Sequence, residues 1–241
     1  MIQNHMNLKN PFLNTFLFVF SIGFMSSYQH VYAQQNCLKI PVIATFNYKP
    51  VVLNDTVYVL ANNHRIKFET LKFYISGVTL VKNNVEVWKE ANSFHLIDVE
   101  EDSNYVCLDI EDDLVFDGIS FNLGIDSITN VSGALGGDLD PTKGMYWTWQ
   151  NGYVNFKLEG TSDLCKNPKN EFQFHLGGYV RPNLNVQKVA VMLNNSAQFS
   201  IEFNLSQFVN ELDLENLNHI MSPNQAAVEL SQHAAKCFSI K

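Results

Sequence analysis

Basic residues are scarce in this sequence, and their scarcity excludes one large class of function. Lys and Arg number 16 against 24 Asp and Glu, which gives a formal net charge of −8 at pH 7. Nucleic-acid binding needs clustered cations to neutralise phosphates, and the sequence offers no basic stripe. Nucleic acid is therefore not an expected partner. An acidic surface favours solubility and, weakly, cations as partners.

Long apolar runs are also rare. One run spans Phe12 to Met25, shorter than the ~20 residues that cross a bilayer, and Asn14 interrupts it. Val31-Tyr32-Ala33 then supplies the small residues typical of a cleavage site. We expect residues 1–33 to be a cleaved secretory signal peptide rather than a membrane anchor. Residues 37–241 would then form one exported domain, periplasmic or secreted.

Cysteine is sparse, with four residues in the chain: Cys37, Cys107, Cys165 and Cys237. No C-x-x-C pair occurs, which argues against a thiolate zinc site or a redox site. An even number of cysteines in an exported chain suggests disulfides, and three pairings are possible. Cys107 lies in an alternating apolar run, so a buried free thiol is an alternative to a disulfide at this position.

Helical patterns are few, and strand patterns dominate the remaining sequence. Eighteen Phe, nine Tyr and frequent Val, Ile and Thr favour β structure. We expect a single all-β domain, an antiparallel sandwich of Greek-key or jelly-roll type with a short C-terminal helix. That helix is predicted over Ser222–Ala235, with Ser222 as N-cap and Pro223 in the first turn. Shorter helical turns are expected near residues 126–131 and 205–212. Strands are expected over residues 38–46, 57–60, 71–81, 85–88, 94–99, 105–110, 119–124, 153–158, 172–176, 188–193 and 199–203.

The densest aromatic cluster lies between residues 136 and 160. Trp147 and Trp149 are two residues apart, a spacing that places both on one face of an extended chain. A cluster of this kind indicates either a corner of the core or a ligand or metal site. Its members are Tyr146, Trp147, Trp149, Tyr153 and Phe156.

An acidic, glycine-rich loop precedes this cluster. Asp138 and Asp140 have two interpretations, of which the first is ordinary turn chemistry, because Asp140 precedes Pro141. The second is part of a hard-cation site, with calcium as the candidate ion. An oxygen cage needs more than two ligands, so the turn is favoured.

Two histidines lie within apolar strand patterns, each between Phe and Leu: His95 and His175. On an alternating strand each imidazole faces away from its neighbours, either into a shared polar site or towards water. Two neutral imidazoles in a dry aromatic pocket suit copper, and Cu(I) in particular accepts few ligands. His219 is a weaker third candidate, because it precedes the predicted helix and could fold back towards the site.

The segment GDLDPTKGMYWTWQNGYVNFKLEG resembles a signature of the MbnP-like copper-binding family, the methanobactin-associated periplasmic type. LKFYISGVTL, FHLID, ISFNLGIDS and FHLGGY resemble the same family in the same order, so the resemblance covers nearly the whole mature chain. It implies binding of copper, as Cu(I) or Cu(II). It also implies that a di-haem partner related to cytochrome c peroxidases oxidises a tryptophan to kynurenine. Trp147 and Trp149 are the candidates, ahead of Trp88.

Two other functions stay open from the residues alone. In a carbohydrate-binding module, Tyr146, Trp147 and Trp149 would form an exposed, coplanar stacking platform, so the exposure of the indoles separates this alternative from copper binding. For an enzyme, Asp98 and Glu159 are a candidate carboxylate pair. No G-x-S-x-G or H-E-x-x-H motif occurs, and we do not expect catalysis.

Overall fold

The computed structural model describes residues 37–111, 113–193 and 198–241. The chain divides into two units, residues 1–34 and 35–241, and the described residues lie in the second. The predicted signal peptide is outside the described residues. Within the described ranges, no helix is both long enough and apolar enough to cross a membrane.

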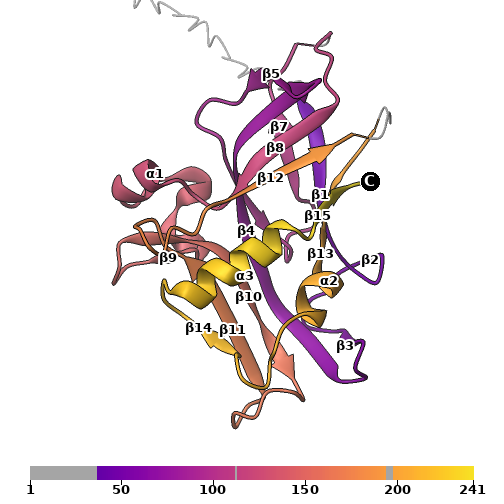
Figure 1. Ribbon diagram of the computed structural model, residues 1–241, viewed down its shortest axis with the longest axis vertical. Helices are drawn as coiled ribbons and strands as arrows, with labels where there is room; N and C mark the ends of the chain where they lie inside the picture. Colours follow the sequence, from indigo (N-terminus) through magenta and orange to yellow (C-terminus); the bar gives the residue numbers. More distant parts are fainter. Residues whose placement is uncertain (1–36, 112, 194–197) are drawn as a thin grey trace, which may run out of the picture. The chain divides into compact units, whose positions relative to one another are not determined.

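Strand β4 (Arg65–Lys82) is the centre of the larger sheet (Figure 1). Its alternating aromatic and β-branched residues suit a pleated, two-faced strand. Leu71, Phe73 and Ile75 point into the core on one face, while Lys72 points to the other. Five other strands pair with β4, so it fixes the register of most of the sheet.

The larger sheet has ten strands, six of which form its main path in the order β12-β8-β4-β10-β11-β14. The remaining four pair at the sides of β4 and β10. The bounds of the main path are β12 Gln187–Met192, β8 Gly118–Leu123, β10 Gly152–Ser162, β11 Glu171–Gly177 and β14 His219–Ile220. The side strands are β3 Val57–Val59, β5 Val85–Lys89, β6 Phe94–Asp98 and β9 Tyr146–Trp147.

The smaller sheet has five strands in the order β15-β13-β1-β2, with β7 also paired to β1. Most pairings in the two sheets are antiparallel, as expected. However, β1 runs parallel to β13, and β14 runs parallel to β11, so both sheets are mixed. The bounds are β1 Leu38–Phe46, β2 Lys49–Pro50, β7 Tyr105–Leu108, β13 Ile201–Asn204 and β15 Phe238–Ile240.

Phenylalanine rings fill the space between the two sheets. Phe73 of the larger sheet lies 5.6 Å from both Phe203 and Phe238 of the smaller sheet, measured between ring centroids. Phe156 lies 5.5 Å from Phe203. These edge and tilted contacts join the inner faces into one core. The expected all-β sandwich is therefore confirmed.

Within the described residues, three α-helices accompany the sheets: α1 (Ser127–Val131), α2 (Leu205–Asn210) and α3 (Gln225–Ala235). Helix α3 packs against β11 and β12 (Figure 1). Its N-cap is Asn224, whose side chain accepts a hydrogen bond from the backbone of Ala227 at 2.8 Å. The prediction that Ser222 caps this helix is wrong, because the first helical turn begins after Pro223.

One disulfide joins Cys37 to Cys107 and ties β7 to the start of β1. Cys107 is therefore not a free thiol. The two free thiols are Cys165 and Cys237, and both are buried.

Candidate functional site

His95 and His175 lie on opposite faces of the larger sheet. His95 pairs with Ile75 of β4, which points into the core. His175 pairs with Lys157, which in turn pairs with Lys72 of β4. Lys72 and Ile75 are three residues apart on one strand and point to opposite faces. The expectation that the two imidazoles share a site is therefore wrong, because sheet register separates them.

His95 is part of a polar contact that holds the connection between β5 and β6. Its Nε2 lies 2.8 Å from Glu90 Oε2, and the Ser93 hydroxyl donates to the same carboxylate oxygen. Ser93 Oγ also accepts a hydrogen bond from Val78 N at 3.1 Å. These bonds satisfy groups that would otherwise be buried without partners. The role of His95 in this arrangement is to stabilise the connection.

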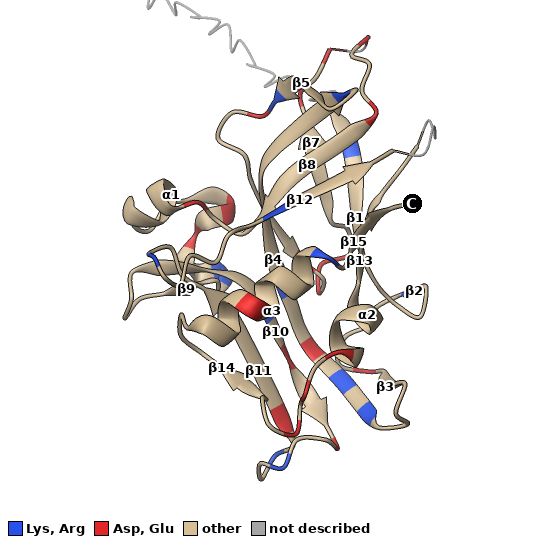
Figure 2. Ribbon diagram, viewed as in Figure 1, with Lys and Arg blue, Asp and Glu red and all other residues tan. Residues whose placement is uncertain are grey.

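His175 begins a polar row on the outer face of the sheet. Register places His175, Lys157, Lys72 and Asp98 side by side across β11, β10, β4 and β6. Lys72 Nζ lies 2.6 Å from Asp98 Oδ2, with both side chains largely buried. At the start of β4, the positive Arg65 and Lys67 are followed by the negative Glu69 (Figure 2). Positive and negative groups thus neutralise one another across this face.

Glu159 is the direct partner of His175. Its Oε1 lies 2.6 Å from His175 Nε2 and 3.7 Å from Lys157 Nζ. The hydrogen bond from His175 is the main reason that the pKa of Glu159 falls to about 2. Burial acts in the opposite direction, while Lys157 and a hydrogen bond from Thr70 lower the pKa further. Glu159 is therefore a carboxylate at any physiological pH.

The sequence suggested a different partner for Glu159. As a catalytic pair, Glu159 and Asp98 would act on one bond, but each carboxylate instead has its own partner, the His175 ring or the Lys72 ammonium group. Both carboxylates do lie on the outer face. The pattern that could have indicated the true pairing is the alternation Lys157-x-Glu159 opposite Gln173-x-His175.

Trp147 borders the polar row. A Cβ on Gly177 would lie 2.7 Å from a carbon of the Trp147 ring, so the indole packs directly over this glycine. Gly177 is two residues from His175 on the same strand and therefore on the same face. The Trp147 side chain is 7% exposed and belongs to a small cluster with Tyr74 and Tyr153.

Trp149 lies in the turn after β9 and is 65% exposed. The expectation that Trp147 and Trp149 share one face of an extended chain is wrong, because the strand ends between them. Their ring centroids are nonetheless 5.7 Å apart, with 42° between the planes. One indole is buried and the other is tilted against it, so they do not form the coplanar exposed platform that sugar stacking requires. Tyr146 is half-buried, and its hydroxyl donates to Asn151 Oδ1 at 2.5 Å.

Exposed apolar side chains occur on the segments that neighbour the turn of Trp149. Three segments meet here, because Ser127 Oγ donates to Tyr179 O at 2.8 Å and Asn130 Oδ1 accepts from Tyr153 N at 2.8 Å. Residues 127–137 and 144–156 contain no charged side chain. We call the exposed members the Trp149 patch: Ile128, Val131, Leu135, Trp149 and Val180.

The two loop aspartates do not converge on a cation site. Asp138 forms an ion pair with Lys143 at 2.7 Å, and its Oδ2 accepts a hydrogen bond from Leu96 N at 3.1 Å. Asp140 caps the short helical turn η2 (Pro141–Lys143) by accepting from Thr142 N at 2.8 Å. Both carboxylates therefore support the loop, as the turn interpretation predicted. Calcium at this loop stays a prediction without a geometric basis.

His219 lies on the same outer face as His175. It pairs with Gln173 of β11, while the adjacent Ile220 points into the core beside Phe174. His175 is two residues beyond Gln173, so the two histidines are diagonal neighbours with Cα atoms about 8 Å apart. His219 is exposed and lines a hollow of about 410 Å³ with Gln173. Across the described ranges, no three His, Cys, Asp or Glu side chains are grouped to hold a metal.

Comparison with known proteins gives one sequence family and one solved structure. The sequence model of the MbnP family matches residues 35–222. A structure described as MbnP from Methylosinus trichosporium is similar with a TM-score of 0.55 and 13% identity, covering 84% of this chain and 96% of that one. No curated protein matches. The structural likeness shows the shared fold, and the family match covers most of the sequence. This chain therefore belongs to the MbnP family.

Proposed function

We propose that this protein binds copper on the outer face of β10, β11 and β14, with His175 as the principal ligand. The observation that carries the proposal is the position of His175. It lies two residues from Gly177, over which the Trp147 ring packs, and Glu159 Oε1 lies 2.6 Å from its Nε2. His219 is the proposed second ligand because it occupies the same face. Family membership supports the metal, and the proposed role is binding and not catalysis.

The donor set fits an ion that accepts few ligands. Among the described residues, His175 and His219 are the imidazole donors placed on this face, and the neighbouring Trp147 is itself buried. Imidazole suits copper, and a two-nitrogen set suits Cu(I) better than a cation that needs an oxygen cage. Copper bound here would be carried or stored by the protein. The chain supplies the nitrogen donors and, through Glu159, the orientation of the His175 ring.

Cu(I) titration against a competing chelator tests the proposal. We expect His175→Ala to lose most of the Cu(I) affinity and His219→Ala to lose part of it. His95→Ala is the matched control, because it removes the histidine that has the same sequence context on the other face. The proposal fails if His175→Ala binds Cu(I) as tightly as the unsubstituted protein while remaining folded by circular dichroism.

We further propose that a di-haem peroxidase-type partner, using peroxide as the oxidant, converts Trp147 to kynurenine. The indole C2–C3 bond is cleaved with gain of two oxygens to give N-formylkynurenine, and hydrolysis then releases the formyl carbon as formate. The new amine and ketone would then lie over Gly177, two residues from His175. Trp149 supports this proposal as the exposed contact for the partner, because its ring is 5.7 Å from Trp147. The Trp149 patch supports it as a docking surface, because its five members are exposed apolar side chains and carry no charge themselves.

Intact-mass measurement and peptide mapping after co-expression with such a peroxidase test the modification. Kynurenine adds about 4 Da, since one oxygen is gained and one carbon is lost. We expect Trp147→Phe to abolish the gain and Trp149→Phe to retain the site but reduce the yield. Modification mapped to Trp149 or Trp88 would contradict the assignment.

A further inference from the structure

The hydrogen bond between His175 and Glu159 determines which ring nitrogen of His175 is free. A carboxylate only accepts hydrogen bonds, and Glu159 Oε1 lies 2.6 Å from His175 Nε2. The proton of a neutral imidazole must therefore be on Nε2. The lone pair is then on Nδ1.

Glu159 is itself held in place by the sheet, so the preference for a proton on Nε2 of His175 follows from the fold. Its backbone pairs with Gln173 on one side and Thr70 on the other, and Lys157 Nζ lies 3.7 Å from the same carboxylate oxygen. The side chains of His175 and Glu159 are 10% and 22% exposed. Because both side chains are largely buried, water competes only weakly for the short hydrogen bond between them.

Nδ1 of His175 is available to an incoming ion. It makes no hydrogen bond to any described residue. Among the described residues, four fully buried side-chain atoms have no hydrogen-bond partner, and His175 Nδ1 is not one of them. They are Gln150 Oε1, Asn185 Oδ1, Glu202 Oε2 and Ser231 Oγ. An unpaired nitrogen that is not fully buried can bind a metal without first losing a hydrogen bond to the protein.

We propose that Glu159 is a positioning residue that locks His175 in the Nε2–H tautomer and presents Nδ1 as the metal-binding atom. The claim that copper binds at Nδ1 rests on the function proposed above. The claim about the tautomer does not depend on that function. A carboxylate behind a metal-binding imidazole also raises its basicity. The two parts can therefore be tested separately.

The tautomer is tested without metal by long-range ¹H–¹⁵N correlation spectra of the His175 ring in the apo-protein. We expect the Nε2–H form alone in the unsubstituted protein. Glu159→Gln should give a mixture, because an amide can either donate to Nε2 or accept from it. A dominant Nδ1–H form in the unsubstituted protein, or an unchanged tautomer in Glu159→Gln, would overturn the proposal. Folding of each variant is checked by its amide spectrum.

The metal-binding part is tested by Cu(I) titration of the same variants. We expect Glu159→Gln to weaken Cu(I) binding by about 10–100-fold. Glu90→Gln is the matched control, because it makes the same change behind His95 on the other face and should leave the affinity unchanged. Equal losses in both variants would overturn a specific role for Glu159. If His175→Ala also leaves copper binding intact, the proposed function fails, while the tautomer result stands on its own.

Discussion

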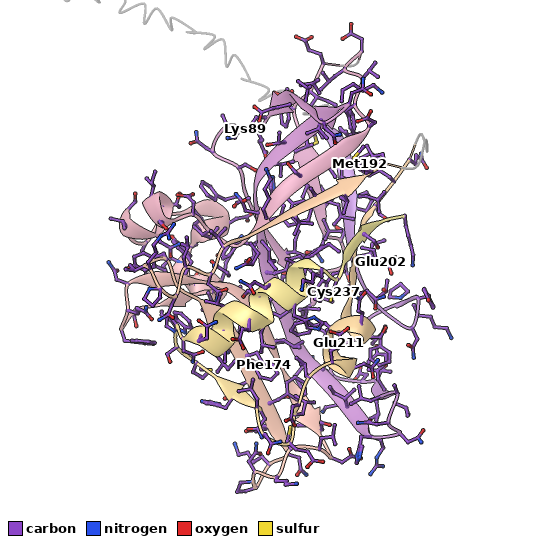
Figure 3. The ribbon with its side chains drawn as sticks, viewed as in Figure 1. Lys89, Phe174, Met192, Glu202, Glu211 and Cys237 are labelled. Carbon is purple, nitrogen blue, oxygen red and sulfur yellow. A yellow bond between two sulfur atoms is a disulfide. The ribbon has the colours of Figure 1, made fainter. Side chains whose placement is uncertain are left out.

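His95 and His175 occupy the same tripeptide context, Phe-His-Leu, yet their environments are reversed. In β11 the flanking Phe174 and Leu176 point into the core, so His175 points outward (Phe174 is labelled in Figure 3). In β6 the flanking Phe94 and Leu96 pack against the cluster of Tyr74, Trp147 and Tyr153, so His95 shares the core face with Ile75. Identical local patterns thus place imidazoles on opposite faces, because a strand has two faces and its sequence does not say which one is inner.

The two free thiols provide a prediction at the residue scale. Burial raises the pKa of Cys165 to about 11 and that of Cys237 to about 12, so neither forms appreciable thiolate at pH 8. We expect Ellman's reagent to detect no thiol in the folded protein and two thiols after unfolding without reductant.

Reduction before unfolding should reveal four thiols, because the Cys37–Cys107 disulfide then opens. Rapid labelling of the folded protein would contradict the burial of both residues. Four thiols without reductant would contradict the disulfide.

At the scale of elements, the contact between β4 and β10 organises the larger sheet. The two strands pair from Phe73–Phe156 to Ile66–Ser162, with a shift in register between Glu159 and Gly160. At this irregularity the backbones approach closely. A Cβ on Gly160 would lie 2.1 Å from the carbonyl oxygen of Lys67. Glycine is therefore required here for close approach, and the position of Glu159 depends on the same irregularity.

Gly160→Ala should destabilise the protein by about 1–3 kcal/mol or more, because the clash involves backbone atoms that cannot move aside. Urea unfolding followed by tryptophan fluorescence measures the change. Gly136→Ala is the matched control, since that position has a φ of −97° and no atom within 4 Å of a Cβ. Equal stability of the two variants would contradict the close contact between β4 and β10.

At the scale of the whole described domain, one buried carboxylate links the strands of the smaller sheet. Glu202 on β13 (Figure 3) is 3% exposed, and its Oε1 accepts a hydrogen bond from Thr45 of β1 at 2.6 Å. Its Oε2 contacts the ammonium group of Lys241, which follows β15, although without hydrogen-bond geometry. The backbone of Lys241 also pairs with Ser200. Charge and backbone together hold the segment after β15 against the sheet.

Lys241→Met should lower the free energy of unfolding by about 1–3 kcal/mol, because it leaves Glu202 buried with one hydrogen bond and no counter-charge. Lys49→Met, an exposed change on β2 of the same sheet, is the control and should have little effect. Adding Glu202→Gln to Lys241→Met should recover part of the loss. The interpretation fails if the double variant is less stable than Lys241→Met alone.

The sequence by itself determined the all-β class, the family and most strand positions, because alternation, aromatic content and a long signature segment are local properties. Only the tertiary structure decided how the strands meet. The parallel β1–β13 and β11–β14 pairs, the Cys37–Cys107 disulfide and the separation of His95 from His175 all depend on register between distant segments. The register between two strands depends on how much apolar surface both strands bury on each face of the sheet. The sequence of one segment does not reveal this, because the partner strand lies far away along the chain.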